Sequence, residues 1–125
     1  NLMLLENNEL GVIDFQDAVV GSNTYDLVSL LKDAYFELKP TEVQVLLVYF
    51  YEQANIQNPF AKFEKQFDLM GLQRHLKVLG IFKRLSLRDG KHQYLADIPL
   101  VAKYVLAIAN KYPELKSLSS ILELA

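Results

Sequence analysis

The sequence contains no cysteine, and its 13 Lys and Arg residues are balanced by 15 Asp and Glu residues. Without cysteine, disulfide scaffolds, zinc knuckles and thiol nucleophiles are excluded. The chain also lacks the strongly basic charge that is typical of nucleic-acid binders. Its longest apolar run, residues 45–51, is much shorter than the roughly 20 residues that a membrane-spanning helix needs. These absences predict a cytoplasmic protein that binds neither nucleic acid nor a membrane.

The chain nevertheless has enough apolar character to form a core, because 51% of its 125 residues are hydrophobic and 22% are charged. A chain of this length is typical of one domain. It contains no internal repeat, no low-complexity tract and no linker that would separate two domains. We therefore expect residues 1–125 to form a single domain.

Two short apolar runs at the N-terminus predict a β-hairpin. They span residues 2–5 and 10–15 and flank the polar residues 6–9. Asparagine tolerates the left-handed conformations that tight hairpin turns require, so we expect the turn to be centred on Asn7 and Asn8. Neither run alternates between apolar and polar residues, and both faces of the hairpin are therefore expected to be covered.

Five helices are expected after the hairpin. Apolar residues recur at helical spacing from residue 27, and Pro40 ends the first helix because the residue before a proline avoids the α conformation. Thr41 and Gln44 form a capping box for the second helix. The five predicted helices lie at about 27–38, 41–54, 59–87, 97–108 and 113–122. The expected fold is mainly α, with a small β part at the N-terminus.

The predicted hairpin brings an amide oxygen and a carboxylate oxygen together at its open end. Its register pairs Leu5 with Leu10 and therefore places Asn1 opposite Asp14. Oxygen donors of this kind suit Mg²⁺, which takes few protein ligands and completes its coordination with phosphates and water. An Asn and an Asp hold Mg²⁺ in kinase-type phosphotransferases. The alternative is that Asn1 is a frayed terminus and Asp14 a turn residue, and the spacing alone leaves both interpretations open.

Several segments around the hairpin carry a family resemblance. Gly-Val-Ile-Asp-Phe-Gln-Asp-Ala at 11–18 and Tyr-Asp-Leu at 25–27 resemble the aminoglycoside phosphotransferase and choline kinase-like superfamily. Asn1 resembles the last residue of the catalytic loop of that superfamily. Residues 14–18 and 67–80 most resemble the bacterial anomeric N-acetylmuramate/N-acetylglucosamine kinases.

The resemblance implies a fold, a cofactor and a set of residue roles. The chain would be the C-terminal part of a protein kinase-like C-lobe, with Asn1 and Asp14 as ligands of Mg²⁺ and with ATP as co-substrate. Asp17 would orient a metal ligand or a metal-bound water without binding the ion itself, or it would only cap a turn. Asp26 would brace the catalytic loop. The nucleotide lobe and the catalytic Asp of the family would precede Asn1. We therefore expect no catalytic residue in this chain and no phosphotransferase activity from it alone.

Two residues of the long third helix are candidates for binding the acceptor substrate. Arg74 falls within the apolar stripe of this helix, where an unpaired charge costs several kcal/mol or more. It either pairs with a structural acid, Asp26 or Asp33, or binds the lactyl carboxylate of N-acetylmuramate. His75, at the edge of the stripe, either donates to a sugar hydroxyl or is a satisfied core histidine.

Three hypotheses about function therefore follow from the sequence. The first is the C-terminal piece of a kinase that transfers the γ-phosphoryl group of ATP to a sugar hydroxyl, the anomeric one of N-acetylmuramate or N-acetylglucosamine, in cell-wall recycling. The second is a phosphotransferase of the aminoglycoside or choline type. The third belongs to another class, a non-catalytic helical interaction module, which has no need of hard oxygen ligands at the end of a hairpin.

Overall fold

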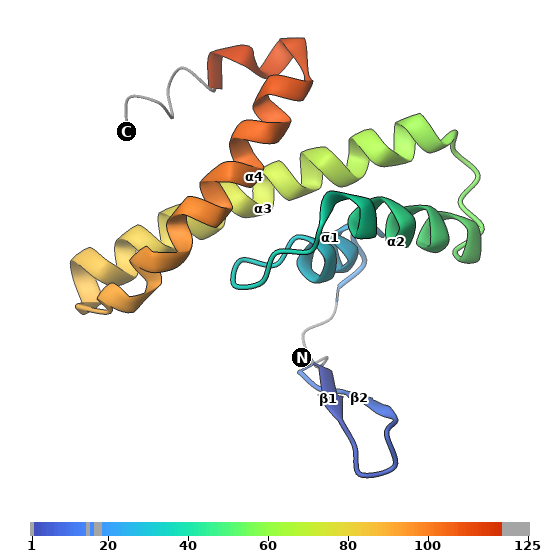
Figure 1. The fold of residues 1–125 in the computed structure, drawn as a ribbon, viewed down its shortest axis with the longest axis horizontal. Helices are drawn as coiled ribbons and strands as arrows, with labels where there is room; N and C mark the ends of the chain where they lie inside the picture. The colour runs from blue at the N-terminus through green and yellow to red at the C-terminus, as the bar shows by residue number, and fades with distance from the viewer. Residues whose placement is uncertain (1, 15, 17–18, 119–125) are drawn as a thin grey trace.

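A computed structural model describes residues 2–14, 16 and 19–118 of the chain (Figure 1). It begins with an antiparallel two-stranded hairpin, and helices make up most of the rest. The elements are β1 (Leu2–Leu4), β2 (Leu10–Val12), α1 (Tyr25–Leu31), α2 (Pro40–Gln53), α3 (Phe60–Asp89), the 3₁₀ helix η1 (His92–Asp97), α4 (Ile98–Lys111) and the 3₁₀ helix η2 (Pro113–Leu115). The predicted fold, mainly α with an N-terminal hairpin, is confirmed.

The first helix, α1, is shorter than predicted, because it ends at Leu31 and not near residue 38. The Oδ1 atom of Asp33 accepts hydrogen bonds from the backbone N–H groups of Tyr35 and Phe36, at 2.7 and 3.1 Å. Such side-chain bonds give the backbone an alternative to the helical ladder. The apolar spacing past Leu31 therefore belongs to a loop between α1 and α2.

Helix α2 begins one residue earlier than predicted, at Pro40, and its cap differs from the one expected. The backbone N–H of Lys39 donates to Glu42 Oε2 at 2.8 Å. Proline suits the first helical position because its fixed φ matches the helix and its missing N–H has no partner there anyway. The capping box predicted from Thr41 and Gln44 was therefore wrong.

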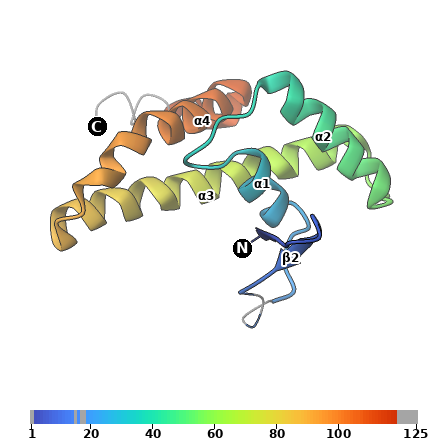
Figure 2. The same cartoon turned by 60° about the horizontal axis from the view of Figure 1, so that its bottom comes forward.

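The long helix α3 is the element against which the other helices pack (Figures 1 and 2). It runs over 30 residues and ends at Gly90, whose φ of 65° is the left-handed conformation that commonly terminates helices. One core cluster joins α3 to α1 and α2, and a second joins α3 to α4. Their buried members are Leu27, Val28, Leu31, Leu47, Phe63 and Phe67 in the first, and Leu72, Val105 and Ile108 in the second.

The last predicted helix begins as expected at Pro113 but as a 3₁₀ turn, and residues 116–118 continue it in α conformation. Its predicted apolar residues Ile121 and Leu122 lie outside the described residues. Within the described part of the chain, no helix is both long enough and apolar enough to cross a membrane.

The register of the hairpin differs by one residue from the prediction. Leu2 pairs with Val12 and Leu4 with Leu10. The turn is longer than expected because Asn8 takes the left-handed conformation, with φ 61°, and its N–H donates to the carbonyl of Leu5 at 3.0 Å. Such a residue after a tight turn gives a three-residue loop, which shifts every pair by one. The predicted pairing of Leu5 with Leu10 was therefore wrong, whereas the predicted pair of Asn1 with Asp14 involves a residue outside the described part of the chain.

The hairpin also lies apart from the helices, below α1 in Figure 1, and its apolar side chains are exposed. Leu4 and Leu10, which pair across the strands, keep 70% and 66% of their surface accessible. The expectation that both faces would be covered is wrong for this chain, because the described helices bury their apolar faces against α3 and not against the hairpin.

Candidate functional site

Asp14 follows β2 by two residues and has an unusual backbone conformation. Its φ of 60° lies in the left-handed region that non-glycine residues seldom adopt. Such a conformation costs on the order of 1–3 kcal/mol and is found most often at functional sites. The side chain is exposed, and its Oδ1 accepts a hydrogen bond of 3.1 Å from Gln16 Nε2. The hairpin therefore presents this carboxylate to the solvent in a defined geometry.

An exposed carboxylate of this kind has the chemistry of a magnesium ligand. The described residues contain no group of three or more His, Cys, Asp or Glu side chains that would form an all-protein metal site. Mg²⁺ generally takes few protein oxygens and completes its coordination with phosphates and water. Asn1 and Asp17, the other residues predicted for this site, lie outside the described residues, and their roles stay predictions.

Asp26 lies where the sequence indicated, in the exposed first turn of α1. A carboxylate there is favoured by the positive end of the helix dipole. The turn before it is held by two contacts of Ser22, whose Oγ lies 2.8 Å from Thr24 Oγ1 and accepts the Thr24 N–H at 3.3 Å. These contacts fix the start of α1, and the bracing role of Asp26 stays a prediction.

Arg74 contacts neither of its two predicted acidic partners. Its Nη1 donates to Tyr25 Oη at 3.3 Å, and its guanidinium carbon lies 5.5 Å from the centre of the Tyr25 ring. No ion pair among the described residues includes Arg74, which is half-buried. Helical spacing placed this residue on the correct face of α3 but could not show that an aromatic residue lies opposite it. The structural pairing with Asp26 or Asp33 was therefore wrong.

His75 is a core residue with only 1% of its surface accessible. Its Nε2 lies 2.9 Å from the backbone carbonyl of Lys32, and its ring stacks on Tyr104 with a centroid distance of 4.9 Å. Burial lowers the pKa of His75, which keeps the imidazole neutral. The satisfied core histidine is thus the interpretation that the structure supports, and the burial of His75 leaves it no access to a sugar.

Sequence reasoning missed a charged cluster around Asp68, which is 4% exposed. Lys111 Nζ and Tyr112 Oη donate to its Oδ2 at 2.7 and 2.9 Å, and Lys32 Nζ lies 3.6 Å from its Oδ1. The cluster joins the end of α1, the middle of α3 and the end of α4. The position of an acid next to Phe67 in the apolar stripe was the one signal available in the sequence.

Burial and the Asp68 charge shift the ionisation of the residues around it. Burial raises the pKa of Tyr112 to about 12, and the hydrogen bond to Asp68 acts in the same direction. Burial also lowers the pKa of Lys32, and the attraction of Asp68 offsets only part of that effect. These directions follow from the cost of placing charge in a poorly hydrated interior.

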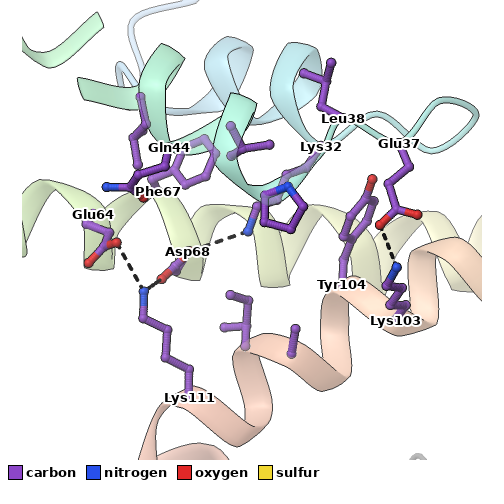
Figure 3. A pocket seen from close by; sticks show the side chains of 15 residues that line it. Lys32, Glu37, Leu38, Gln44, Glu64, Phe67, Asp68, Lys103, Tyr104 and Lys111 are labelled. Atoms are coloured by element: carbon purple, nitrogen blue, oxygen red, sulfur yellow. Dashed lines mark hydrogen bonds and ion pairs between the residues drawn. The ribbon is translucent and has the colours of Figure 1, made fainter. Parts of the chain in front are cut away.

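A pocket of about 300 Å³ opens beside this cluster, between α2, α3, α4 and the loop after α1 (Figure 3). Phe67, Leu47 and Ile108 contribute apolar surface to it, and Tyr104 and Asp68 contribute polar groups. This volume is at the lower end of the range for ligand sites. Sequence reasoning did not find the pocket, because its walls come from segments more than 70 residues apart.

Comparisons with known proteins show a likeness to phosphotransferases. Residues 1–57 match a family described as "Phosphotransferase enzyme family". A protein of Neisseria meningitidis serogroup B, named N-acetylmuramate/N-acetylglucosamine kinase, is 43% identical over 127 aligned positions, which cover 98% of this chain and 38% of that relative. Residues 1–57 therefore resemble this phosphotransferase family, and the likeness to the named kinase extends over nearly the whole chain.

Two further relatives with the same name show how far along the chain the likeness extends. The protein of Pseudomonas putida is 42% identical over 98% of the chain and 37% of its own length, and that of Caulobacter vibrioides is 34% identical over 77% and 26%. The chain thus spans little more than a third of the length of the first of these curated relatives. The family match includes the hairpin, Asp14, α1 and α2. The Asp68 cluster and the α4 wall of the pocket include residues that follow the matched segment.

Proposed function

We propose that this chain is part of an ATP-dependent kinase that transfers the γ-phosphoryl group to a hydroxyl of an amino sugar. The acceptor would be N-acetylmuramate or N-acetylglucosamine, phosphorylated at the anomeric position during cell-wall recycling in the cytoplasm. Relatives of that name, 42–43% identical over nearly the whole chain, support the substrate class. The observation that carries the proposal is Asp14, an exposed carboxylate in a left-handed conformation at the end of a hairpin.

In this proposal the chain supplies metal ligands and not the catalytic base. Mg²⁺ bound at Asp14 would neutralise charge on the nucleotide phosphates during transfer. The hydrogen bond from Gln16 restricts rotation of the Asp14 carboxylate, which orients it before the ion arrives. Asn1 would supply a second oxygen ligand. Asp17 would position the direct ligands without binding the ion itself.

Arg74 is our candidate for contact with the acceptor. It lies against Tyr25, the first residue of α1. Asp14 precedes this same N-terminal end of α1 in the chain. One of its five N–H donors is directed at Tyr25, and a guanidinium binds a carboxylate through two parallel hydrogen bonds. The lactyl carboxylate of N-acetylmuramate is such a group, whereas N-acetylglucosamine lacks it.

The test is Asp14→Asn in the natural protein that carries this chain. Loss of a residue that only hydrogen-bonds to a metal ligand lowers metal affinity or activity by about 10- to 100-fold. Loss of a direct ligand is therefore expected to lower kcat by more than about 100-fold. Glu52→Gln, an exposed acid on α2, is the matched control and should leave kcat unchanged. Phosphorylation of N-acetylmuramate, N-acetylglucosamine, an aminoglycoside and choline would be measured in parallel. Residues 1–125 by themselves are expected to release no ADP.

Metal binding separates this proposal from the helical interaction module. Mn²⁺ is expected to broaden the NMR signals of residues next to Asp14 in the wild-type chain and not in Asp14→Asn. Unchanged spectra for both proteins would favour the module and would contradict the kinase proposal. An unaltered kcat in Asp14→Asn, with Mn²⁺ still bound, would show that the metal ligands lie elsewhere.

A further inference from the structure

The hydroxyl of Tyr104 is a buried polar group without a hydrogen-bond partner among the described residues. A buried hydroxyl is normally paired, and an unpaired one is costly enough to need an explanation. Figure 3 shows the Tyr104 ring extending from α4 toward the loop that carries Leu38, with Glu37 beside it. Burial raises the pKa of Tyr104, and Glu37 and Asp33 act in the same direction, so the phenol keeps its proton as a donor.

The residues around this hydroxyl form the wall of the pocket described above. An ion pair of 2.7 Å between Lys103 Nζ and Glu37 Oε1 lies beside Tyr104 at the edge of the pocket (Figure 3). Both of its side chains are exposed, and exposed ion pairs contribute little to stability. This exposed pair beside Tyr104 can therefore move at small cost.

The charges that line the pocket balance one another. Three lysines and three acids line it, and all six belong to ion pairs within the pocket wall: Lys32, Lys103, Lys111, Glu37, Glu64 and Asp68. An ionic ligand would have to compete with these partners, whereas a neutral ligand leaves them in place. The remaining lining includes the apolar side chains of Phe67, Leu47 and Ile108 and the amide of Gln44. The lining thus favours a neutral molecule with an apolar body.

The pocket is also separate from the candidate metal site. It borders Lys32, at the C-terminal end of α1, whereas Asp14 precedes the N-terminal end of that helix. In Figures 1 and 2 the hairpin lies on one side of α1, and the loop that closes the pocket leaves its other end. The pocket and the candidate metal ligand thus lie toward opposite ends of α1.

We propose that this pocket is a second ligand site, which binds a small, neutral, N-acylated molecule. Its amide carbonyl accepts a hydrogen bond from Tyr104 Oη after the Glu37–Lys103 pair has moved aside. Its apolar part packs on Phe67 and Leu47. The proposal accounts for the unpaired hydroxyl, for the balanced charges and for the apolar floor, and it does not depend on the phosphotransfer reaction.

The experiment measures binding of N-cyclohexylacetamide to the natural protein that carries this chain. With tyrosine rings labelled with ¹³C, titration is expected to shift the Tyr104 signal, which Tyr104→Phe identifies by its loss. Tyr104→Phe should weaken binding about fivefold to tenfold, the equivalent of one neutral hydrogen bond. Tyr49→Phe, on the exposed surface of α2, is the matched control and should bind as the wild type does. Protonated cyclohexylamine, which has the ring without the carbonyl, should not bind.

Two further variants test the route and the place of binding. Glu37→Gln removes the ion pair beside the hydroxyl and should strengthen binding, the opposite of Tyr104→Phe. Ala107→Leu adds volume to the lining on the exposed side of α4 and should abolish binding while the helix is retained. Equal affinity in the wild type and Tyr104→Phe, or no binding up to the solubility limit, would overturn the proposal. Kinase activity plays no part in these readouts, so their outcome is independent of the proposed function.

Discussion

Replacement of Asp68 by alanine tests the buried charge cluster most directly. The carboxylate is 4% exposed and is held by Lys32, Lys111 and Tyr112. Lys111 keeps a second acid, Glu64 at 3.4 Å, and its side chain is 43% exposed. Lys32 is only 17% exposed and would lose the one ion-pair partner recorded for it among the described residues. The main expected cost is therefore an uncompensated charge at Lys32.

The size of the stability loss follows from the charge of Lys32, which stays in the interior without its partner. Removal of one partner of a buried ion pair typically costs about 3–5 kcal/mol, most of which is the penalty of the remaining buried charge. We expect Asp68→Ala to lower the free energy of unfolding by this amount. The double variant Asp68→Ala/Lys32→Met should recover part of the loss, because it removes the stranded charge.

Urea unfolding of the natural protein, followed by circular dichroism, measures these effects. The matched control is Glu114→Gln, which breaks an ion pair of the same 2.7 Å length between Lys65 and Glu114 at an exposed position. It should leave the free energy of unfolding nearly unchanged, because exposed pairs are well screened by water. If Asp68→Ala cost no more than Glu114→Gln, or if the double variant recovered nothing, the argument from burial would be refuted.

Two further predictions concern α3. Because burial lowers the pKa of His75 below its ordinary value of 6.5, the stability from the neutral ring is present above pH 6.5 and is lost as pH falls toward the lowered value. Unfolding measured against pH should show this loss in wild type and in His92→Asn but not in His75→Gln; a loss in all three would contradict it. Arg74→Ala should raise KM for N-acetylmuramate more than KM for N-acetylglucosamine in steady-state assays, and equal changes would argue against contact with the acceptor.

Local chemistry explains which helix boundaries were predictable from the sequence. Gly90 caps the end of α3 because glycine adopts the left-handed conformation without steric cost. The start of α2 was missed by one residue, because Pro40 occupies its first position, where the fixed φ of proline suits a helix start. The end of α1 was missed because Asp33 caps the following backbone through a short-range bond that competes with the helix. The predicted hairpin register was wrong for a similar reason, because one residue in the left-handed conformation, Asn8, lengthened the turn.

The candidate site divides in the same way. Asp14 was selected by its place after the predicted hairpin and by the family resemblance, and its role stays a prediction. The first-turn position of Asp26 follows from a short-range pattern. The partner of Arg74, the burial of His75 and the cluster around Asp68 depend on which elements face one another. A periodic pattern shows which residues share a helix face but not what that face meets.

By itself, the sequence determined a mainly α chain with an N-terminal hairpin, a family resemblance and an acidic residue suited to Mg²⁺. Only the tertiary structure decided that Asp68 holds three helical elements together and that Tyr104 borders a pocket without a partner for its hydroxyl. The physical reason is range. Turn, cap and helix preferences act over about four residues, whereas the pairs at Asp68 and the walls of the pocket join segments separated by 36 to more than 70 positions of the chain.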